Sequence, residues 1–162
     1  MDKIKLRITV MAVLAVFLLK GTDTFAQQTD PTLTGAVFAQ TSTLKNIYDK
    51  RQKAHEKIIA ADVLVLASPV YFYTIDAQMK TLIDRCVARY TEIVNKELYY
   101  IITAADTSLV RMERTVECFR GFADCLDGAV EKGVVYGVGA WKSGDIRQTA
   151  AFQAAWDMGK NI

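Results

Sequence analysis

Histidine, proline and cysteine are scarce in this chain. It has one histidine, and its two prolines and nine glycines form no long linker or low-complexity tract. The three cysteines, Cys86, Cys118 and Cys125, make no C-x-x-C pair. The sequence therefore lacks the spacing of a zinc or iron–sulfur site, and we predict no metal. The net charge of +2 is too small to indicate nucleic acid or a membrane surface as a partner.

The first 26 residues follow the order of a secretory signal peptide. Three basic residues precede an apolar run, Ile8 to Leu19, and Ala26 follows a short polar stretch. The run has about twelve residues, too few for a stable membrane span. We predict a signal peptide over 1–26, which indicates an exported or periplasmic protein. The alternative is a buried parallel strand within Ile8–Val16, although the turn that follows, Phe17 to Gly21, is a poor anion-binding loop.

Residues 27–60 are predicted to be a polar lead-in followed by a helix. The helix, over 44–60, is strongly polar in its middle and is expected to cover only a narrow surface. The stretch Gln27–Ile59 weakly resembles the start of exported helical proteins of bacterial conjugation systems. The predicted division of the chain is therefore 1–26, 27–60, and an α/β domain over 61–162.

From residue 61 onwards, apolar strands alternate with helices. The run Asp62–Ala67 is typical of a strand buried on both faces of a parallel sheet, and Pro69 is expected to end it. Asp76 or Thr74 is expected to cap the helix that follows, whose apolar positions recur from Ile75 to Val94. Further strands are predicted over Leu98–Thr103 and Lys132–Val138, and further helices over 109–126 and 148–160. This alternation predicts a parallel sheet with right-handed crossovers.

Two segments that follow predicted strands are candidates for ligand binding, because ligands bind at the carboxyl ends of the strands in open α/β sheets. The first carries three aromatic residues. The second is rich in small residues, which let a ligand approach the main chain closely. Their residues are Ser68, Pro69, Val70, Tyr71, Phe72 and Tyr73, and Thr103, Ala104, Ala105 and Asp106.

The segment Ala61 to Tyr73, followed by Gln78-Met79-Lys80 and Asp84-Arg85, resembles the flavodoxin-like NAD(P)H-dependent FMN reductase family. Thr103–Asp106 and Gly137–Trp141 fit the later loops of that family, so the resemblance covers residues 60–162. It implies a flavodoxin-like three-layer αβα fold with a parallel sheet. It also implies FMN as cofactor and NAD(P)H as co-substrate.

The resemblance implies hydride transfer from NAD(P)H to the flavin and on to a quinone, another flavin or a similar acceptor. Because the flavin carries the chemistry, no catalytic side chain is nominated. The two candidate segments would bind FMN, the first against its ring system and the second as the next wall. Lys80, Asp84 and Arg85 would be structural or would form a homodimer.

The sequence departs from the family in its first third. We find no Gly/Ser-rich loop to hold the FMN phosphate, so the fold is expected to be incomplete at the N-terminus, with strand 62–67 lacking its inner neighbour. One alternative function is therefore a truncated or chimeric binding module without catalytic activity. Another is an exported component of a transfer apparatus. Export conflicts with a cytosolic reductant, and the sequence leaves localisation open.

Overall fold

Four parallel strands form the main sheet, in the order β1–β2–β4–β5. The computed structural model describes residues 8–12 and 53–162 of the chain, and residues 53–60 are helical. The strands are β1 (Ile8–Ala12), β2 (Val63–Tyr71), β4 (Glu97–Thr103) and β5 (Val130–Gly137), and β3 (Thr74–Ile75) forms a hairpin with β2. The α-helices are α2 (Ala77–Arg85), α3 (Leu109–Ala123) and α4 (Ala150–Lys160).

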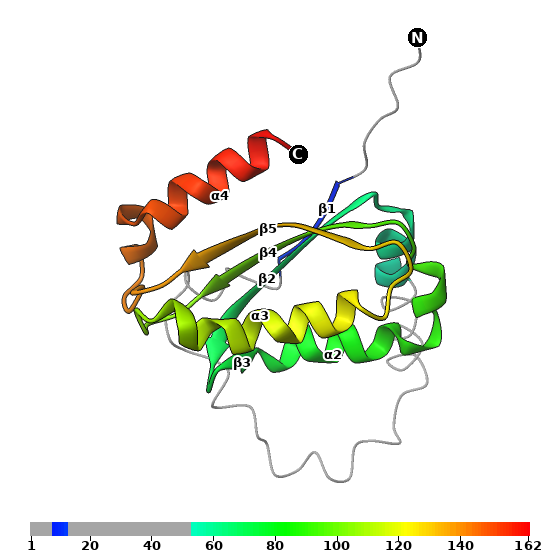
Figure 1. Ribbon diagram of the computed structural model, residues 1–162, viewed down its shortest axis with the longest axis horizontal. Coiled ribbons are helices and arrows are strands. Elements are labelled where there is room, and N and C mark those ends of the chain that lie inside the picture. Colours follow the sequence, from blue (N-terminus) through cyan, green and yellow to red (C-terminus); the bar gives the residue numbers. More distant parts are fainter. Residues whose placement is uncertain (1–7, 13–52) are drawn as a thin grey trace, which may run out of the picture.

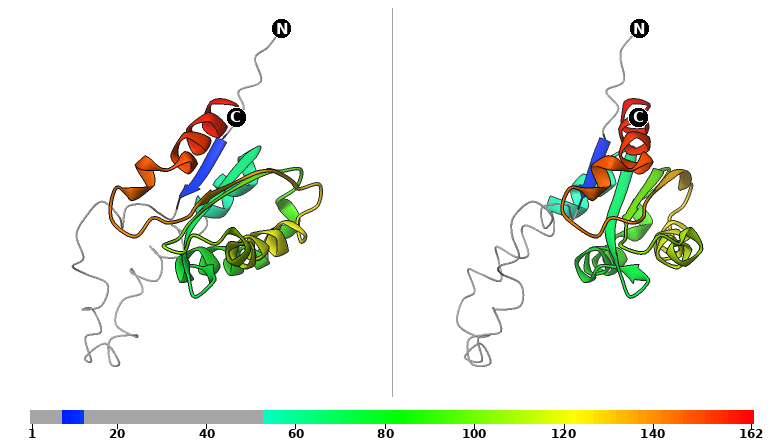
Figure 2. Two further views of the ribbon diagram at one scale, coloured as in Figure 1. Left: turned by 60° about the vertical axis from the view of Figure 1, so that its left-hand side comes forward. Right: turned by 90° about the vertical axis from the view of Figure 1, so that its left-hand side faces the viewer.

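The helices lie on both faces of the sheet. Figure 1 shows α2 and α3 below the strands and α4 above them, and Figure 2 shows the same layers from the side. Strands and helices alternate along the chain from β2 onwards, which is the connection that parallel strands need. The predicted α/β class and parallel sheet are therefore confirmed. No helix in the part of the chain that the structure describes has the length and apolarity of a bilayer span.

Strand β1 lies beside β2, which corrects one expectation from the sequence. Ile8 to Ala12 pair in parallel with Val63 to Ala67, residue by residue. The expectation that strand 62–67 would lack its inner neighbour is therefore wrong, because a strand from the N-terminal segment takes that place. This pairing supports the alternative interpretation of the apolar run as a strand. The signal peptide and the division at 26 and 60 stay predictions, and residues 13–52 lie outside the described residues.

The core lies between the sheet and the helices α2 and α3. Strand β4 alternates, burying Leu98, Tyr100 and Ile102 on this face while the residues between them are half-buried. Strand β2 is buried on both faces over Val63–Leu66, as its continuous apolar run predicts. The side chains that meet these strands come mainly from one stripe on each helix: Met79 of α2, and Met112, Val116 and Phe119 of α3.

Two predicted boundaries differ from the structure. Pro69 does not end β2, which continues to Tyr71 because Val70 and Tyr71 pair with Ile75 and Thr74 of β3. The predicted helix from Ile75 to Val94 is shorter, since α2 ends at Arg85 and two 3₁₀ turns follow it. Those turns still bury Cys86 and lead to the buried Ile93, so the apolar spacing persists although the α-helix does not.

A buried lysine joins the start of the α/β unit to β4. Lys96 is 6% exposed, and its ammonium group donates to the carbonyl oxygens of Ile59 at 2.9 Å and Ala61 at 2.6 Å. These carbonyls lie at the end of helix 53–60, where main-chain acceptors lack partners within the helix. Burial lowers the pKa of Lys96, and the nearby Asp62 partly offsets this.

Candidate functional site

Strands β2, β4 and β5 end at the same edge of the sheet, and the segments that follow them meet there. We call this the carboxyl edge: the turn at Phe72–Tyr73, the loop 104–108 and the loop 138–144. Hydrogen bonds hold the two loops together: Gly139 N–H donates to the carbonyl of Asp106 at 3.1 Å, and Ala140 N–H to that of Ala104 at 3.0 Å. The sequence segments predicted to bind a ligand are thus neighbours in space.

The turn between β2 and β3 displays two aromatic residues in an unfavourable main-chain conformation. Phe72 and Tyr73 have φ values of +50° and +62°, the left-handed region that two-residue hairpin turns usually fill with Asn and Gly. Such a conformation costs roughly 1–3 kcal/mol per non-glycine residue and is concentrated at functional sites. Phe72 is fully exposed, and Tyr71 before it is 60% exposed. The turn therefore presents apolar ring surface to solvent.

Buried polar residues support this turn from below. Ser68 and Asp76 are both buried, and the main-chain N–H of Asp76 donates to Ser68 Oγ at 2.9 Å. Asp76 also begins α2 as its N-cap, since its carboxylate accepts the Met79 N–H at 2.7 Å. The sequence analysis named Asp76 and Thr74 as candidates for the N-cap of α2, and the structure shows that the cap is Asp76. The strand that leads into the turn and the helix that leaves it are fixed together.

Asp106 organises the loop after β4. Its carboxylate accepts the main-chain N–H of Ser108 at 2.8 Å and pairs with the Arg111 guanidinium at 2.9 Å. These two interactions, the Ser108 hydrogen bond foremost, hold the pKa of Asp106 below its ordinary value. Within the described residues, the main-chain N–H groups of Ala105 and Asp106 have no acceptor. The loop therefore offers two consecutive donors to a ligand at the carboxyl edge.

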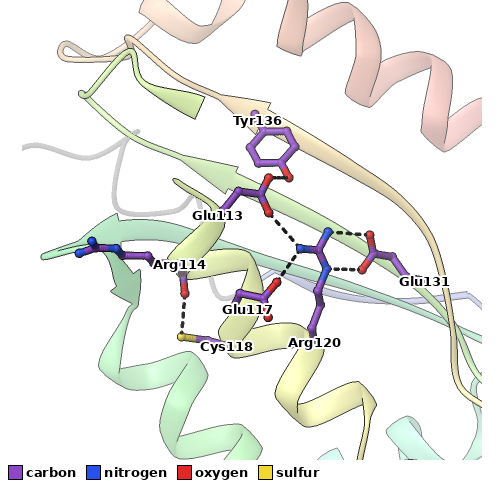
Figure 3. Close-up of polar contacts among 7 residues, drawn as sticks. All are labelled: Glu113, Arg114, Glu117, Cys118, Arg120, Glu131 and Tyr136. Carbon is purple, nitrogen blue, oxygen red and sulfur yellow. Dashed lines mark hydrogen bonds and ion pairs between the residues drawn. The ribbon is translucent and has the colours of Figure 1, made fainter. Parts of the chain in front are cut away.

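Arginine side chains of α3 approach the aromatic turn. The Arg114 guanidinium lies 5.8 Å from the centre of the Tyr73 ring, and Thr74 Oγ1 lies 3.4 Å from Cys118 Sγ. In Figure 3, Arg114 projects from one side of α3, whereas Glu113, Glu117 and Arg120 point the other way, toward β5. The turn is thus held against α3 through Tyr73 and Thr74.

The loop after β5 displays a tryptophan that sequence reasoning did not place in the site. Trp141 is 79% exposed, and the Asp145 carboxylate accepts the main-chain N–H groups of Trp141 at 3.1 Å and Lys142 at 2.6 Å. Gly139 and Gly144 permit this loop, because both adopt positive φ values. The resemblance had assigned Gly137–Trp141 to a later loop of the family, and an aromatic residue among glycines after a strand was the signal that could have singled out Trp141.

The predicted site residues divide into two groups. The exposed or half-exposed Tyr71, Phe72, Tyr73, Ala105 and Asp106 face solvent at the carboxyl edge. The others shape the edge from inside. Ser68 and Ala104 are buried, and Pro69, Val70 and Thr103 are half-buried members of the strands.

The exposed group fits the ring end of FMN. A flavin ring system has flat apolar faces and a polar edge that accepts and donates hydrogen bonds, and the carboxyl edge offers aromatic surface beside the free N–H groups of Ala105 and Asp106. Residues 13–52, which follow β1, lie outside the described residues, so the phosphate end of the cofactor stays an open prediction. The exposed aromatic side chains and the two main-chain N–H groups are therefore of the kind that the ring system of FMN needs.

A separate polar cluster ties α3 to β5, the last strand of the sheet order, along the length of that strand. The Arg120 guanidinium pairs with Glu113 at 2.9 Å, Glu117 at 2.8 Å and Glu131 at 2.8 Å, and Tyr136 donates to Glu113 (Figure 3). These pairs raise the pKa of Arg120 above its ordinary value. A groove of about 410 Å³ lies beside this cluster. In residues 8–12 and 53–162, no group of three His, Cys, Asp or Glu side chains is arranged to hold a metal.

Comparison with solved structures identifies the fold. The chain is similar to the Trp repressor binding protein of Bacillus subtilis, with a TM-score of 0.59 and 23% identity over 65% of this chain and 73% of that one. It is also similar to the NADPH-quinone reductase of P. pentosaceus (TM-score 0.54, 15% identity, 69% and 75% covered). An azoreductase of Bacillus anthracis gives a TM-score of 0.53 at 18% identity, with 80% and 71% covered. These likenesses show that the fold is flavodoxin-like.

Comparison with protein families agrees with the structural one. None of the curated proteins matches the chain. The family described as NADPH-dependent FMN reductase matches residues 13–125, which include the aromatic turn, the loop 104–108 and all of α3. This match spans well over half of the sequence, and the chain belongs to the NADPH-dependent FMN reductase family.

Proposed function

We propose that this protein is an FMN-dependent oxidoreductase that uses NAD(P)H as its reductant. Bound FMN would supply the redox chemistry by which NAD(P)H is oxidised and a quinone, another flavin or a similar acceptor is reduced. Family membership supports the flavin and the nicotinamide dinucleotide. The quinone reductase and azoreductase among the similar structures make a quinone a reasonable first acceptor to assay.

One observation carries the proposal: the aromatic turn is held in a strained conformation beside two free main-chain donors. Tyr71 and Phe72 would pack against a face of the flavin rings, since their side chains are exposed although the strand below them is buried. The N–H groups of Ala105 and Asp106 would bind the polar edge of the rings. Trp141 would close the third side and exclude water from the reacting face.

In this proposal the protein orients the cofactor and the reductant, and its side chains transfer no protons. The ionised Asp106 is engaged by Ser108 and Arg111, so it fixes the loop rather than serving as a base. This agrees with a site in which the cofactor carries the electrons and the chain supplies shape and hydrogen bonds.

Titration with FMN tests the proposal directly. We expect purified full-length protein to quench FMN fluorescence in a saturable manner and to oxidise NAD(P)H when a quinone is added. Phe72→Ala is expected to weaken FMN binding about two- to tenfold, the range of one aromatic contact. Phe152→Ala, which removes an exposed aromatic from α4, is the matched control and should leave FMN affinity unchanged.

Two outcomes would contradict the proposal. Wild-type protein that shows a cooperative unfolding transition but no saturable quenching of FMN does not use this cofactor. Saturable FMN binding without NAD(P)H oxidation, across quinone and flavin acceptors, would favour the alternative of a binding module without catalytic activity.

A homodimer is part of the proposal. The family resemblance assigns Lys80, Asp84 and Arg85 of α2 a structural or dimer-forming role, and Val87, two residues after Arg85, is 72% exposed, so a second copy that packs on this helix would remove its side chain from water. Light scattering at two protein concentrations tests this. A mass of about one chain, 18.0 kDa, at both concentrations and with FMN present would show that the protein acts as a monomer.

A further inference from the structure

The Tyr100 hydroxyl is a buried polar group without a hydrogen-bond partner. Tyr100 lies in the middle of β4 and is 0% exposed, and among the described residues nothing donates to its hydroxyl or accepts from it. Nearly all buried polar groups in native proteins have a partner, and a phenylalanine would fill the same space without the cost of an unpaired hydroxyl. A tyrosine at this position therefore calls for a binding partner.

The hydroxyl lies at a groove between the end of α3 and the start of β5. Tyr100 lines this groove, which has a volume of about 410 Å³, and its ring stacks on Phe119 with 5.2 Å between the ring centres. Burial raises the pKa of its hydroxyl to about 12, and the charges of Glu131, Arg120 and Asp124 act on it as well. These three residues also line the groove, so the hydroxyl end of the ring points into it.

The groove carries an excess of negative charge. Three carboxylates line it, those of Glu117, Asp124 and Glu131, against the single guanidinium of Arg120. Arg120 binds Glu117 and Glu131, each at 2.8 Å (Figure 3). The Asp124 carboxylate is exposed and has no ion pair with any residue that the structure describes. The groove therefore attracts a cation, and Asp124 is the anion available to bind it.

The remaining lining of the groove is apolar, and its length suits a short chain. Ala123, Leu126 and Ala129 offer surface that a hydrocarbon chain can cover. Glu117 and Asp124 are seven residues apart on one face of α3, which is about 10 Å at 1.5 Å per residue. A four-carbon chain with an ammonium group at each end, and a hydrogen bond of about 2.9 Å beyond each, covers about this distance.

We propose that this groove binds an aliphatic diamine, with one ammonium group between the Tyr100 hydroxyl and the Asp124 carboxylate and the other at Glu117. An ammonium group has three N–H donors and no acceptor. The Tyr100 hydroxyl is neutral at pH 7, so its oxygen accepts one of these donors. Glu117 is 63% exposed, and it can turn aside to admit the amine before it binds the second ammonium group. The groove lies at the start of β5, whereas the carboxyl edge lies at its end, so this site is separate from the proposed flavin site.

Calorimetric titration of the full chain with 1,4-diaminobutane at low salt tests the site. We expect saturable binding that weakens as sodium chloride is raised. Tyr100→Phe should weaken it about tenfold, as expected for one hydrogen bond to a charged group. Asp124→Asn should weaken it about two- to fivefold, the range of an exposed ion pair. 1,4-Butanediol, which has the same carbon chain without charge, should not bind.

Tyr99→Phe and Asp127→Asn are the matched controls. Tyr99 adjoins Tyr100 on β4, where alternate side chains lie on opposite faces of the sheet. Asp127 is an exposed carboxylate three residues after Asp124 that does not line the groove. Both variants should bind the diamine as the wild type does. Thermal unfolding supplies a second measurement: the diamine should raise the midpoint of the wild type more than that of Tyr100→Phe, and a cooperative transition shows that each variant is folded.

Three results would overturn the site, and none of them involves FMN or NAD(P)H. If Tyr100→Phe binds the diamine as tightly as Tyr99→Phe, the hydroxyl makes no contact with it. If Asp124→Asn and Asp127→Asn weaken binding equally, the diamine responds only to overall charge. If butanediol binds as well as the diamine, or magnesium chloride raises the unfolding midpoint as much at the same concentration, the groove does not recognise a diamine.

Discussion

The main-chain N–H of Asp76 donates to Ser68 Oγ at 2.9 Å, which joins the N-cap residue of α2 to the strand eight residues before it. The aromatic turn lies between these two residues. A buried hydrogen bond between the residues that flank the turn therefore stabilises its strained main-chain conformation. A turn with an unfavourable main-chain conformation persists only where its surroundings determine it, and this pair is part of those surroundings.

We predict that Asp76→Ala destabilises the protein and disturbs the turn. The substitution removes the carboxylate that accepts the Met79 N–H at 2.7 Å, and loss of an N-cap costs about 0.5–2 kcal/mol. Urea unfolding measures the free energy. Asp76→Ser keeps a capping oxygen and should retain most of the stability. Equal stability of the wild type, the alanine variant and the serine variant would show that the cap contributes nothing.

Gly137 and Gly121 are predicted to respond to alanine in opposite directions. A Cβ at Gly137 would lie 2.8 Å from Ile146 Cδ1 and 3.1 Å from the Ile102 carbonyl oxygen, which belongs to the neighbouring strand and cannot move aside easily. Gly137→Ala should therefore cost about 1–3 kcal/mol. A Cβ at Gly121, inside α3, meets nothing within 4 Å, so Gly121→Ala should gain about 0.5–1 kcal/mol.

Thermal or urea unfolding of the two glycine variants checks this pair. A loss of stability in Gly137→Ala reports how closely Ile146 and β4 approach β5 at the carboxyl edge, and Gly121→Ala shows that the same change is tolerated where there is space. A Gly137→Ala variant as stable as wild type would mean that the edge is more open than the structure shows.

The sheet was predictable from the sequence because its strands are short apolar runs between turn-rich segments. β4 and β5 lie within one or two residues of the predicted strands, since buried parallel strands need such runs. The prediction that β2 ends at Pro69 was wrong. A proline usually ends a strand, but here β3 pairs with Val70 and Tyr71 immediately after it, so the strand continues. The identity of β1 could not be decided, because a signal peptide and a buried strand require the same apolar composition.

The candidate site was predictable only in part. Position after a strand, together with the family resemblance, indicated the aromatic turn and the loop 104–108. The approach of Arg114 to Tyr73 was beyond the sequence, since forty-one positions separate the two residues and their contact depends on how α3 packs against the hairpin. The free main-chain N–H groups of Ala105 and Asp106 could not be predicted either, because every residue except proline has such a group.

Tyr100→Phe is predicted to stabilise the protein at neutral pH. Tyr100 is completely buried against Phe119, and its hydroxyl has no hydrogen-bond partner in the described part of the chain. A buried unpaired hydroxyl costs about 1–3 kcal/mol, and phenylalanine preserves the ring without it. Urea unfolding at pH 7 measures the change. A loss of stability above about 1 kcal/mol would show that the hydroxyl has a partner.

The same substitution is predicted to change the response to alkaline pH. Burial raises the pKa of Tyr100 to about 12, whereas the unfolded chain releases this proton near pH 10. Between these values the folded state holds a proton that the unfolded state has lost, so stability falls as pH rises, by about 1.4 kcal/mol per pH unit. Tyr136, whose pKa burial and Glu113 also raise to about 12, acts in the same direction. In Tyr100→Phe, the free energy of unfolding should therefore fall less steeply between pH 10 and pH 12 than in the wild type, and urea unfolding at several pH values measures this.

Arg120→Met is predicted to destabilise the protein by about 1–2 kcal/mol at low salt, because it leaves three carboxylates close together without their cation. High salt should reduce the loss, since screening weakens repulsion between exposed charges. Arg89→Met removes a single pair and should cost less than about 1 kcal/mol. Unfolding at 0.05 M and 1 M sodium chloride compares them. Equal losses in the two variants would mean that the cluster acts only as separate pairs.

Removing the N-terminal strand distinguishes the two interpretations of the apolar run. The chain from residue 27 onwards is what a signal peptidase would release, and it lacks β1, which pairs with β2 over five consecutive residues. We predict that this shortened chain loses several kcal/mol of stability, or its cooperative transition, because the β2 edge loses its neighbour and exposes main-chain groups to water. Val10→Pro in the full chain should weaken the pairing in the same direction, because proline is poorly tolerated inside a paired strand. Mass spectrometry of the protein from cells supplies the second half of the test. An intact N-terminus together with a less stable 27–162 chain establishes the strand, whereas a cleaved N-terminus and an unchanged unfolding free energy establish the leader.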